Sequence, residues 1–118
     1  MIDVEYISSY CLAKKGVVET FPFNETTLVF KVMGKMFALL PLENGDRIAL
    51  KCDPERAMEL REEWEEITGA FHMNKKHWNT VMTSGRISVE LLRELIDHSY
   101  DLVVASLKKS LKEELAAL

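Results

Sequence analysis

The residues best suited to chemistry lie in the window 67–89, which contains no Asp or Glu although the chain has 19 of them. The window combines cations, an amide, histidines and an aromatic ring: His72, Asn74, Lys75, Lys76, His77, Trp78 and Arg86. Cationic and amide side chains bind phosphate oxygens, and aromatic rings stack on bases. The window therefore fits a surface that contacts a nucleic-acid backbone. A polar β-turn with Trp78 in the core fits the same composition.

A second set of cations is predicted on one face of a β-sheet. Segments 28–33, 36–41 and 47–52 alternate as strands do, and Gly34-Lys35 suits a type II′ turn between the first two. One face then holds Phe30, Val32, Phe37, Leu39, Ile48 and Leu50, and the other holds Lys31, Met33, Met36, Ala38, Arg47, Ala49 and Lys51. The second face carries three cations and no acid. It could lie on a polyanion, or it could be an ordinary solvated face.

The other reactive side chains form no recognisable catalytic or metal site. His72 and His77 are five residues apart, without the further ligands that complete a metal site. Cys52 continues the inward stripe of its strand, so a buried, inert thiol is expected. The acidic run 62–66 fits a solvated helix face, with iron binding there as a remote alternative. We therefore expect no enzyme, no metal and no cofactor.

The composition is that of a single domain over residues 1–118. A net charge of −4 gives no overall cationic field, so a nucleic-acid partner would have to be met by a local patch. The first residues have neither a basic start nor an apolar run, and no window approaches about 18 apolar residues. We expect no membrane partner and a cytoplasmic location, with Cys11 and Cys52 reduced.

Helical elements are predicted from their start and stop signals. Asp3 caps a first helix, which ends at 14–16, and residues 17–27 follow as a loop because Pro22 is unsuited to a central strand. Asp53 caps a second helix, which starts with Pro54 at its first position and runs to near residue 69.

Two more strands, 70–73 and 77–83, precede the last helix. Ser88 caps that helix, and its apolar spacing continues toward residue 118. The order α-βββ-α-ββ-α predicts an α+β fold with an antiparallel sheet and helices packed on one face.

The chain resembles the MmcQ/YjbR family of small bacterial proteins over nearly its whole length. The matching segments are 10–12, 21–23, 30–38, 50–55, 95–96, 99–100 and, most specifically, His72-Met73-Asn74-Lys75-Lys76-His77-Trp78-Asn79-Thr80-Val81. The resemblance implies a frataxin-like (CyaY-like) α+β fold with a curved antiparallel sheet, and a likeness to the double-wing DNA-binding module. The sequence departs from the family after Val81, where Met82-Thr83-Ser84-Gly85 replaces an acidic turn.

The same resemblance implies DNA as the partner, held weakly and largely through its backbone. It makes Lys75 and Lys76 phosphate contacts, Asn74 and His77 polar contacts, and Trp78 either a stacking or a core residue. Lys31 and Lys51 would flank the groove. Arg47 and Arg86 join this set only through the arguments from sheet face and composition.

The alternative is a module that binds a protein or a small ligand without any nucleic-acid role. Its surface would be adaptable and apolar, built from Phe21-Pro22-Phe23, Met33, Met36 and Trp78. In either case we expect a monomer.

Overall fold

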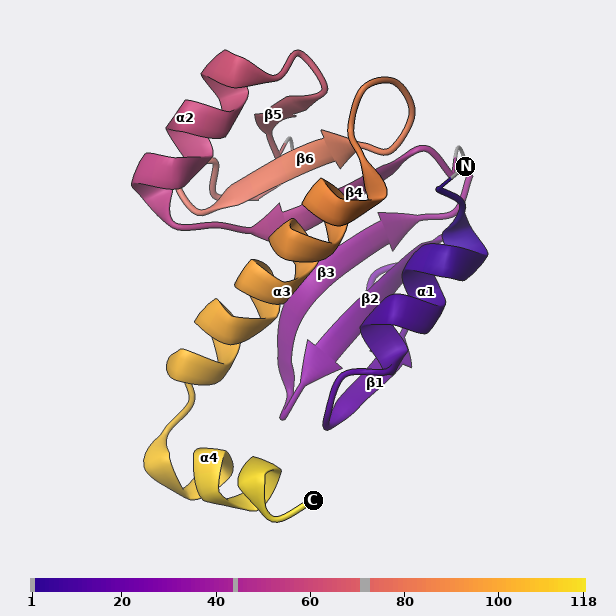
Figure 1. The fold of residues 1–118 in the computed structure, drawn as a ribbon. Helices are drawn as coiled ribbons and strands as arrows, with labels where there is room; N and C mark the ends of the chain where they lie inside the picture. The colour runs from indigo at the N-terminus through magenta and orange to yellow at the C-terminus, as the bar shows by residue number, and fades with distance from the viewer. Residues whose placement is uncertain (1, 44, 71–72) are drawn as a thin grey trace.

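The computed structural model describes residues 2–43, 45–70 and 73–118. Four helices and six strands follow one another along the described chain (Figure 1). In order they are α1 (Val4–Leu12), β1 (Val17–Thr20), β2 (Thr27–Val32), β3 (Lys35–Pro41), β4 (Arg47–Lys51), α2 (Pro54–Glu63), β5 (Ile67–Gly69), β6 (Trp78–Met82), α3 (Val89–Ala105) and α4 (Lys109–Ala116).

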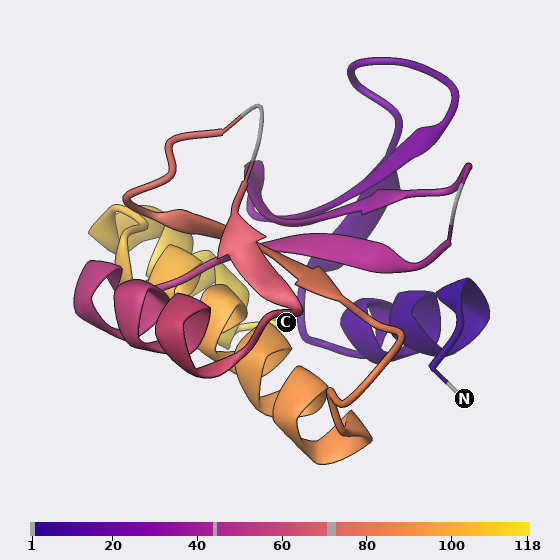
Figure 2. The same ribbon diagram turned by 90° about the horizontal axis from the view of Figure 1, so that it is seen from above.

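The strands form one sheet in the order β1-β2-β3-β4-β6-β5, and every neighbouring pair is antiparallel. Helices α1, α2 and α3 lie on one side of it, and the loop 21–26 and residues 73–77 rise on the other (Figure 2). The predicted α+β fold, with an antiparallel sheet and helices on one face, is confirmed. In the described residues, no helix is both long enough and apolar enough to cross a membrane.

The main core lies between the sheet and the helices. Ile7 and Cys11 of α1 and Leu92 and Ile96 of α3 are buried against inward-facing strand residues such as Phe37. Burying large apolar side chains contributes about 1.5–3 kcal/mol each, so this layer supplies most of the driving force for folding.

The predicted helix starts are confirmed because each depends on a local hydrogen bond. Asp3 Oδ1 accepts from the Tyr6 N–H at 2.8 Å, and Asp53 Oδ2 accepts from the Arg56 N–H at 3.2 Å. Ser88 Oγ likewise accepts from the third N–H of α3 at 3.0 Å. Each cap satisfies a backbone donor that the helix itself cannot pair.

The turn between β2 and β3 lies one residue earlier than predicted. Met33 (φ 50°) and Gly34 (φ 86°) occupy its two central positions, so Val32 pairs with Lys35. Positive φ at both positions is the pattern of a type I′ turn, which matches the twist of the strands. The predicted Gly34-Lys35 type II′ turn is therefore wrong.

A β-bulge at Phe37 adds to this shift and changes which side chains face inward. Phe30 pairs with Ala38 and Lys31 with Met36, which leaves Phe37 as the extra residue of β3. Phe37 and Ala38 both belong to the main core, whereas Leu39 lies in a second cluster on the opposite face. The predictions that Leu39 points inward and Ala38 outward are therefore wrong.

Beyond the bulge, a serine hydroxyl joins β3 and β4. The strands pair directly only through Ala38–Leu50 and Leu39–Ala49. Next to these pairs, the Ser99 hydroxyl of α3 donates to the Phe37 carbonyl at 2.5 Å and accepts from the Lys51 N–H at 2.9 Å. Ser99 is 0 % exposed, so its hydroxyl satisfies two backbone groups that water cannot reach.

Three predicted boundaries in the first two-thirds of the chain are wrong. Residues 17–20 form the edge strand β1, because Val17–Thr20 pairs with β2 before Pro22 is reached. Helix α2 ends at Glu63 because Trp64 takes an extended conformation (φ −124°, ψ 120°). The following strand therefore starts at Ile67 rather than at residue 70.

The last predicted helix is two helices. Helix α3 ends at Ala105, and Lys108 is extended before α4 starts without a side-chain cap. Helix α4 is held instead by buried Leu115, which lies against Gly16, and by the Lys15 Nζ, which donates to the Ala116 carbonyl at 3.0 Å. Docking of its apolar side, rather than local signals, therefore stabilises α4.

Candidate nucleic-acid interface

The side of the sheet opposite α1, α2 and α3 has a hydrophobic cluster of its own and a groove; we call it the open face. Val29, Leu39, Ala70 and Trp78 are buried there, and Met73 packs against them. The remaining part of this face forms a groove of about 500 Å³. Small, apolar and hydroxyl side chains dominate its lining: Thr27, Leu39, Pro41, Arg47, Ala49, Thr68, Gly69, Ala70, Met73 and Thr80.

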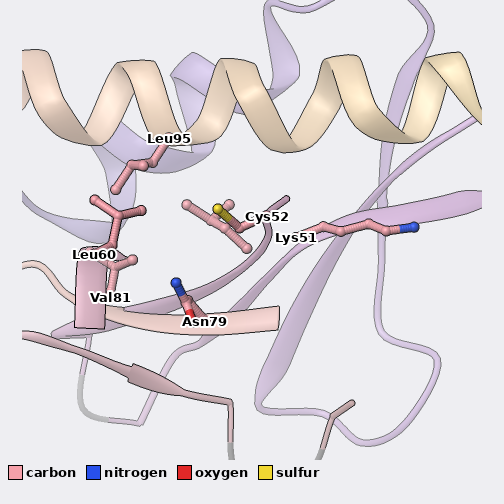
Figure 3. A pocket seen from close by; sticks show the side chains of 7 residues that line it. Lys51, Cys52, Leu60, Asn79, Val81 and Leu95 are labelled. Carbon is pink, nitrogen blue, oxygen red and sulfur yellow. The ribbon is translucent and has the colours of Figure 1, made fainter. Parts of the chain in front are cut away.

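Lys31 and Lys51 belong to the open face. Lys31 pairs across strands with Val18 and Met36, and Lys51 pairs with Trp78, which faces this side. Figure 3 shows the Lys51 side chain leaving its strand away from Cys52 and Leu95, which border an internal cavity of about 10 Å³. Among the described residues, no carboxylate forms a salt bridge with Lys31 or Lys51.

Arg47 also lines the groove, but at the other end of β4. It pairs across strands with Met82, whereas Lys51 pairs with Trp78. Its Nε lies 3.0 Å from Asp46 Oδ1, and this hydrogen bond lowers the pKa of the Asp46 carboxyl. The neighbouring carboxylate therefore offsets much of the charge of Arg47.

The polar turn 74–76 is ordered by its own side chains. Asn74 Oδ1 accepts from the Lys76 N–H at 2.9 Å, and the Asn74 carbonyl accepts from the N–H groups of His77 and Trp78, both at 3.0 Å. This Asx-type turn is a structural use of Asn74. The predicted contact between Asn74 and nucleic acid stays a prediction.

The turn lies beside helix α2 as well as beside the sheet. Arg61 of α2 donates to the carbonyls of Lys75 and Trp78, the latter at 3.3 Å, and to Asn79 Oδ1 at 2.6 Å. Lys75 and Lys76 line a hollow of about 380 Å³ that Glu55, Met58 and other α2 residues complete. Neither lysine lines the groove, although the side-chain stem of Lys75 lies beside Gly69, which does.

Arg86 lies elsewhere. Its guanidinium is 3.2 Å from Glu66 Oε1 and lies over the ring of Trp64, 5.3 Å from the ring centroid. Hydrogen bonds from the side chain and backbone of Arg86 lower the pKa of Glu66 to about 2. The charge of Arg86 is therefore paired with the Glu66 carboxylate.

The structure thus divides the predicted site rather than gathering it. Lys31 and Lys51 share the open face, Arg47 and Arg86 are paired with acids, and Trp78 is 9 % exposed within the second cluster. His77 uses its carbonyl to accept from the Cys52 N–H at 2.7 Å, which continues the pairing of β6 with β4. His72 lies outside the described residues.

The two cysteines and His98 lie on the helix side of the sheet. Burial raises the pKa of the Cys11 thiol to about 12 and raises that of Cys52 as well, as expected for inert thiols. His98 Nε2 accepts from the Asp53 N–H at 3.1 Å, and burial followed by nearby Arg56 lowers its pKa. No group of three or more possible metal ligands gathers within the described ranges.

Sequence reasoning missed Arg61 and the segment that it anchors. Arg61 was one basic residue in an acidic helix, and nothing local indicated that it reaches the turn at residues 75–78. The signal that could have indicated this contact was Asn79, a polar residue within a predicted strand. Its side chain is buried and therefore needs hydrogen-bond partners, one of which is Arg61.

Comparisons with known proteins place these features in a family context. The sequence profile described as YjbR matches residues 12–102. The Escherichia coli O157:H7 protein YbdF, described as uncharacterised, is 41 % identical over 90 residues, covering 75 % of this chain and 74 % of its own. YjbR of Escherichia coli K12, also described as uncharacterised, is 29 % identical over 118 residues, covering 99 % of this chain and 100 % of its own.

Solved structures show the same fold. The crystal structure of Deinococcus radiodurans DR2400, a DUF419 domain, is 41 % identical with a TM-score of 0.90, covering 98 % of this chain and 89 % of that one. A Pseudomonas syringae crystal structure is 28 % identical with a TM-score of 0.72, covering 86 % of this chain and 98 % of that one.

Proposed function

The chain belongs to the YjbR family, and from that premise we propose that it binds DNA weakly, holding the phosphate backbone against the open face of its sheet. The observation that carries the proposal is the placement of Lys31 and Lys51 on one uncovered face, with no carboxylate partner among the described residues. Phosphate contacts of this kind supply most of non-specific binding. A cytoplasmic location belongs to the same proposal.

The distribution of acids supports this placement. The strand residues that alternate toward the open face, among them Val29, Met36, Ala49 and Thr80, include no Asp or Glu. Helix α2, with its run of glutamates, lies on the other side of the sheet (Figure 2). A polyanion can therefore approach one side of a chain whose net charge is −4.

The number of available cations sets the expected strength. With two or three phosphate contacts, the logarithm of the affinity should fall with the logarithm of salt concentration with a slope of about −2 to −3. Kd should be on the order of 10⁻⁶ to 10⁻⁴ M at physiological salt, with little sequence preference. We propose a binding role rather than catalysis, because the thiols of Cys11 and Cys52 are buried in the main core, away from the groove.

A salt titration with a charge-reversed variant tests the proposal. Lys31→Glu/Lys51→Glu should bind a labelled DNA at least about tenfold more weakly at low salt and flatten the salt slope. Lys109→Glu/Lys112→Glu changes the net charge equally on exposed positions of α4 and should leave the slope unchanged. Absence of binding by the wild type at low salt, or equal loss in both variants, would refute the proposal.

The lysines of the turn need a separate variant. Lys76 is exposed beside α2, so Lys76→Glu should weaken binding only if the DNA extends from the groove past this turn. A loss comparable to that of Lys51→Glu alone would join the turn to the interface. An unchanged affinity would confine the interface to the sheet.

A second candidate function rests on the groove itself. About 500 Å³ of mainly apolar lining, with Met73 on one wall, suits a small ligand or an apolar protein segment. Chemical-shift mapping against a set of metabolites should then move the signals of Leu39, Ala49 and Met73 without any dependence on salt. If Phe21–Phe23 shift together with these residues, the loop takes part as the adaptable surface that the sequence predicted.

A further inference from the structure

Two exposed phenylalanines stand on the loop between β1 and β2. Phe21 is 48 % and Phe23 62 % exposed, which are large values for apolar rings. The loop is nevertheless ordered, since Asn24 Oδ1 accepts from the N–H groups of Thr26 at 2.9 Å and Thr27 at 2.8 Å. The rings are therefore presented by a defined turn.

The loop lies on the same side of the molecule as the open face. It rises from the sheet on the side away from α1, α2 and α3 (Figure 2), and Thr27, the first residue after it, lines the groove. Val18, the cross-strand partner of Lys31, precedes Phe21 by three residues, or about 10 Å of extended chain. One short strand of nucleic acid can thus contact Lys31 and the rings together.

We infer that the nucleic acid recognised by the open face is single-stranded, and that Phe21 and Phe23 form its base-stacking platform. The inference rests on the proposed function and names the form of nucleic acid that this site takes. In a duplex the faces of the bases are stacked on each other, whereas in a single strand they are available to aromatic side chains. Exposed rings within reach of Lys31, which has no carboxylate partner among the described residues, are the combination that such binding uses.

The other aromatic residues of the described chain are committed elsewhere. Trp78 packs in the second cluster, and Trp64 lies beneath Arg86. The Tyr10 hydroxyl donates to Asp97 at 2.7 Å, and the Tyr100 hydroxyl donates to the Lys15 carbonyl at 2.6 Å, both on the helix side. Stacking therefore falls to the phenylalanine pair rather than to Trp78, for which the sequence had left stacking and a core position open.

The experiment compares two forms of DNA in the same anisotropy titration at low salt. The probes are a labelled thymine oligonucleotide of about 16 nucleotides, the upper end of site sizes for small modules, and a duplex of the same length. The wild type should bind the single strand at least about fivefold more tightly. Phe21→Ala/Phe23→Ala should weaken single-strand binding at least about fivefold, with the salt slope and duplex binding unchanged.

The control is Met58→Ala, which removes an equally exposed apolar side chain from α2 and should alter neither affinity. Because Phe21, Phe23 and Met58 are exposed, these variants should keep the wild-type melting temperature, measured by circular dichroism.

The outcomes distinguish a failure of the inference from a failure of the proposed function. If Phe21→Ala/Phe23→Ala is neutral, or the duplex binds as tightly as the single strand, while Lys31→Glu/Lys51→Glu still weakens binding, the inference is overturned and the proposed function stands. If the wild type binds neither probe, the proposed function fails and the inference falls with it. Loss of single-strand binding alone in the phenylalanine variant supports both.

Discussion

Replacing Ser99 with alanine should destabilise the chain far more than the loss of one oxygen atom suggests. The hydroxyl is completely buried and bridges the Phe37 carbonyl and the Lys51 N–H at the point where β3 and β4 separate. In Ser99→Ala both backbone groups stay buried, and no other polar group replaces the hydroxyl.

The expected loss follows from those two groups. A buried backbone donor or acceptor without a partner costs about 1–3 kcal/mol, so two of them cost about 2–6 kcal/mol. Alanine returns about 0.5 kcal/mol through its higher helix propensity. The free energy of unfolding should therefore fall by about 2–5 kcal/mol, which lowers the melting temperature of a domain of this size by at least about 6 °C.

Urea unfolding followed by circular dichroism measures this loss, and amide hydrogen exchange localises it. The Lys51 amide should exchange faster in Ser99→Ala, because its acceptor is gone. Ser9→Ala is the matched control, since Ser9 is an exposed helical serine in α1 and its replacement should change stability by less than about 0.5 kcal/mol. A Ser99→Ala loss no larger than that of the control would refute the assignment of the hydroxyl as the bridge.

Three further predictions concern single side chains. Glu66→Gln should reduce the decrease in the free energy of unfolding at low pH. Arg86 lowers the pKa of Glu66 to about 2, so the stabilisation by Glu66 is present above about pH 4.5 and is lost as the pH falls toward 2. The lowered pKa of His98, whose Nε2 accepts from the Asp53 N–H, predicts that stability falls as the pH drops below about 6.5; His98→Asn, which can accept without titrating, should remove this dependence in pH-dependent urea unfolding. Leu115→Ala should cost about 2–4 kcal/mol or selectively unfold α4, as measured by hydrogen exchange of its amides.

Matched variants test these expectations. Glu62→Gln alters an exposed carboxylate on α2 that forms no salt bridge with a described residue, and it should leave the acid limb unchanged. Leu118→Ala removes an exposed leucine near Leu115 and should cost less than about 0.5 kcal/mol. If Glu66→Gln behaves like Glu62→Gln, or Leu115→Ala like Leu118→Ala, the contact proposed to stabilise the first residue of that pair is refuted.

The parts of the fold that the sequence predicted are those determined by neighbouring residues. The caps at Asp3, Asp53 and Ser88 were readable because the side chain and the backbone donor are three residues apart. The fold class followed from the order of these elements. Residues 17–20, by contrast, form a strand rather than the predicted loop, because pairing with β2 is a long-range property that the nearby Pro22 does not determine.

The errors in the sheet arose from one turn and one bulge. Glycine at the first central position made Gly34-Lys35 the better local choice, but the turn uses the rarer positive φ of Met33. The extra residue at Phe37 then changed the alternation, so Leu39 moved to the open face. Neither event has a local signal, since both depend on how β3 meets β2 and β4.

The candidate site was predictable only in composition. The acid-free window and the lysines on alternate strand positions were visible in the sequence, and Lys31 and Lys51 do share a face. The position of the 74–76 turn beside α2 depends on the hydrogen bonds of Arg61, which bring distant parts of the chain together.

The order of the strands has a consequence for self-association. The two outermost strands, β1 and β5, are only four and three residues long. A second copy that added a strand to the sheet could form at most one or two pairs of backbone hydrogen bonds with either edge strand. Short edge strands of this kind protect proteins against aggregation through sheet edges. We therefore expect the chain to stay monomeric in concentrated solution, with its long central strands shielded by the short ones.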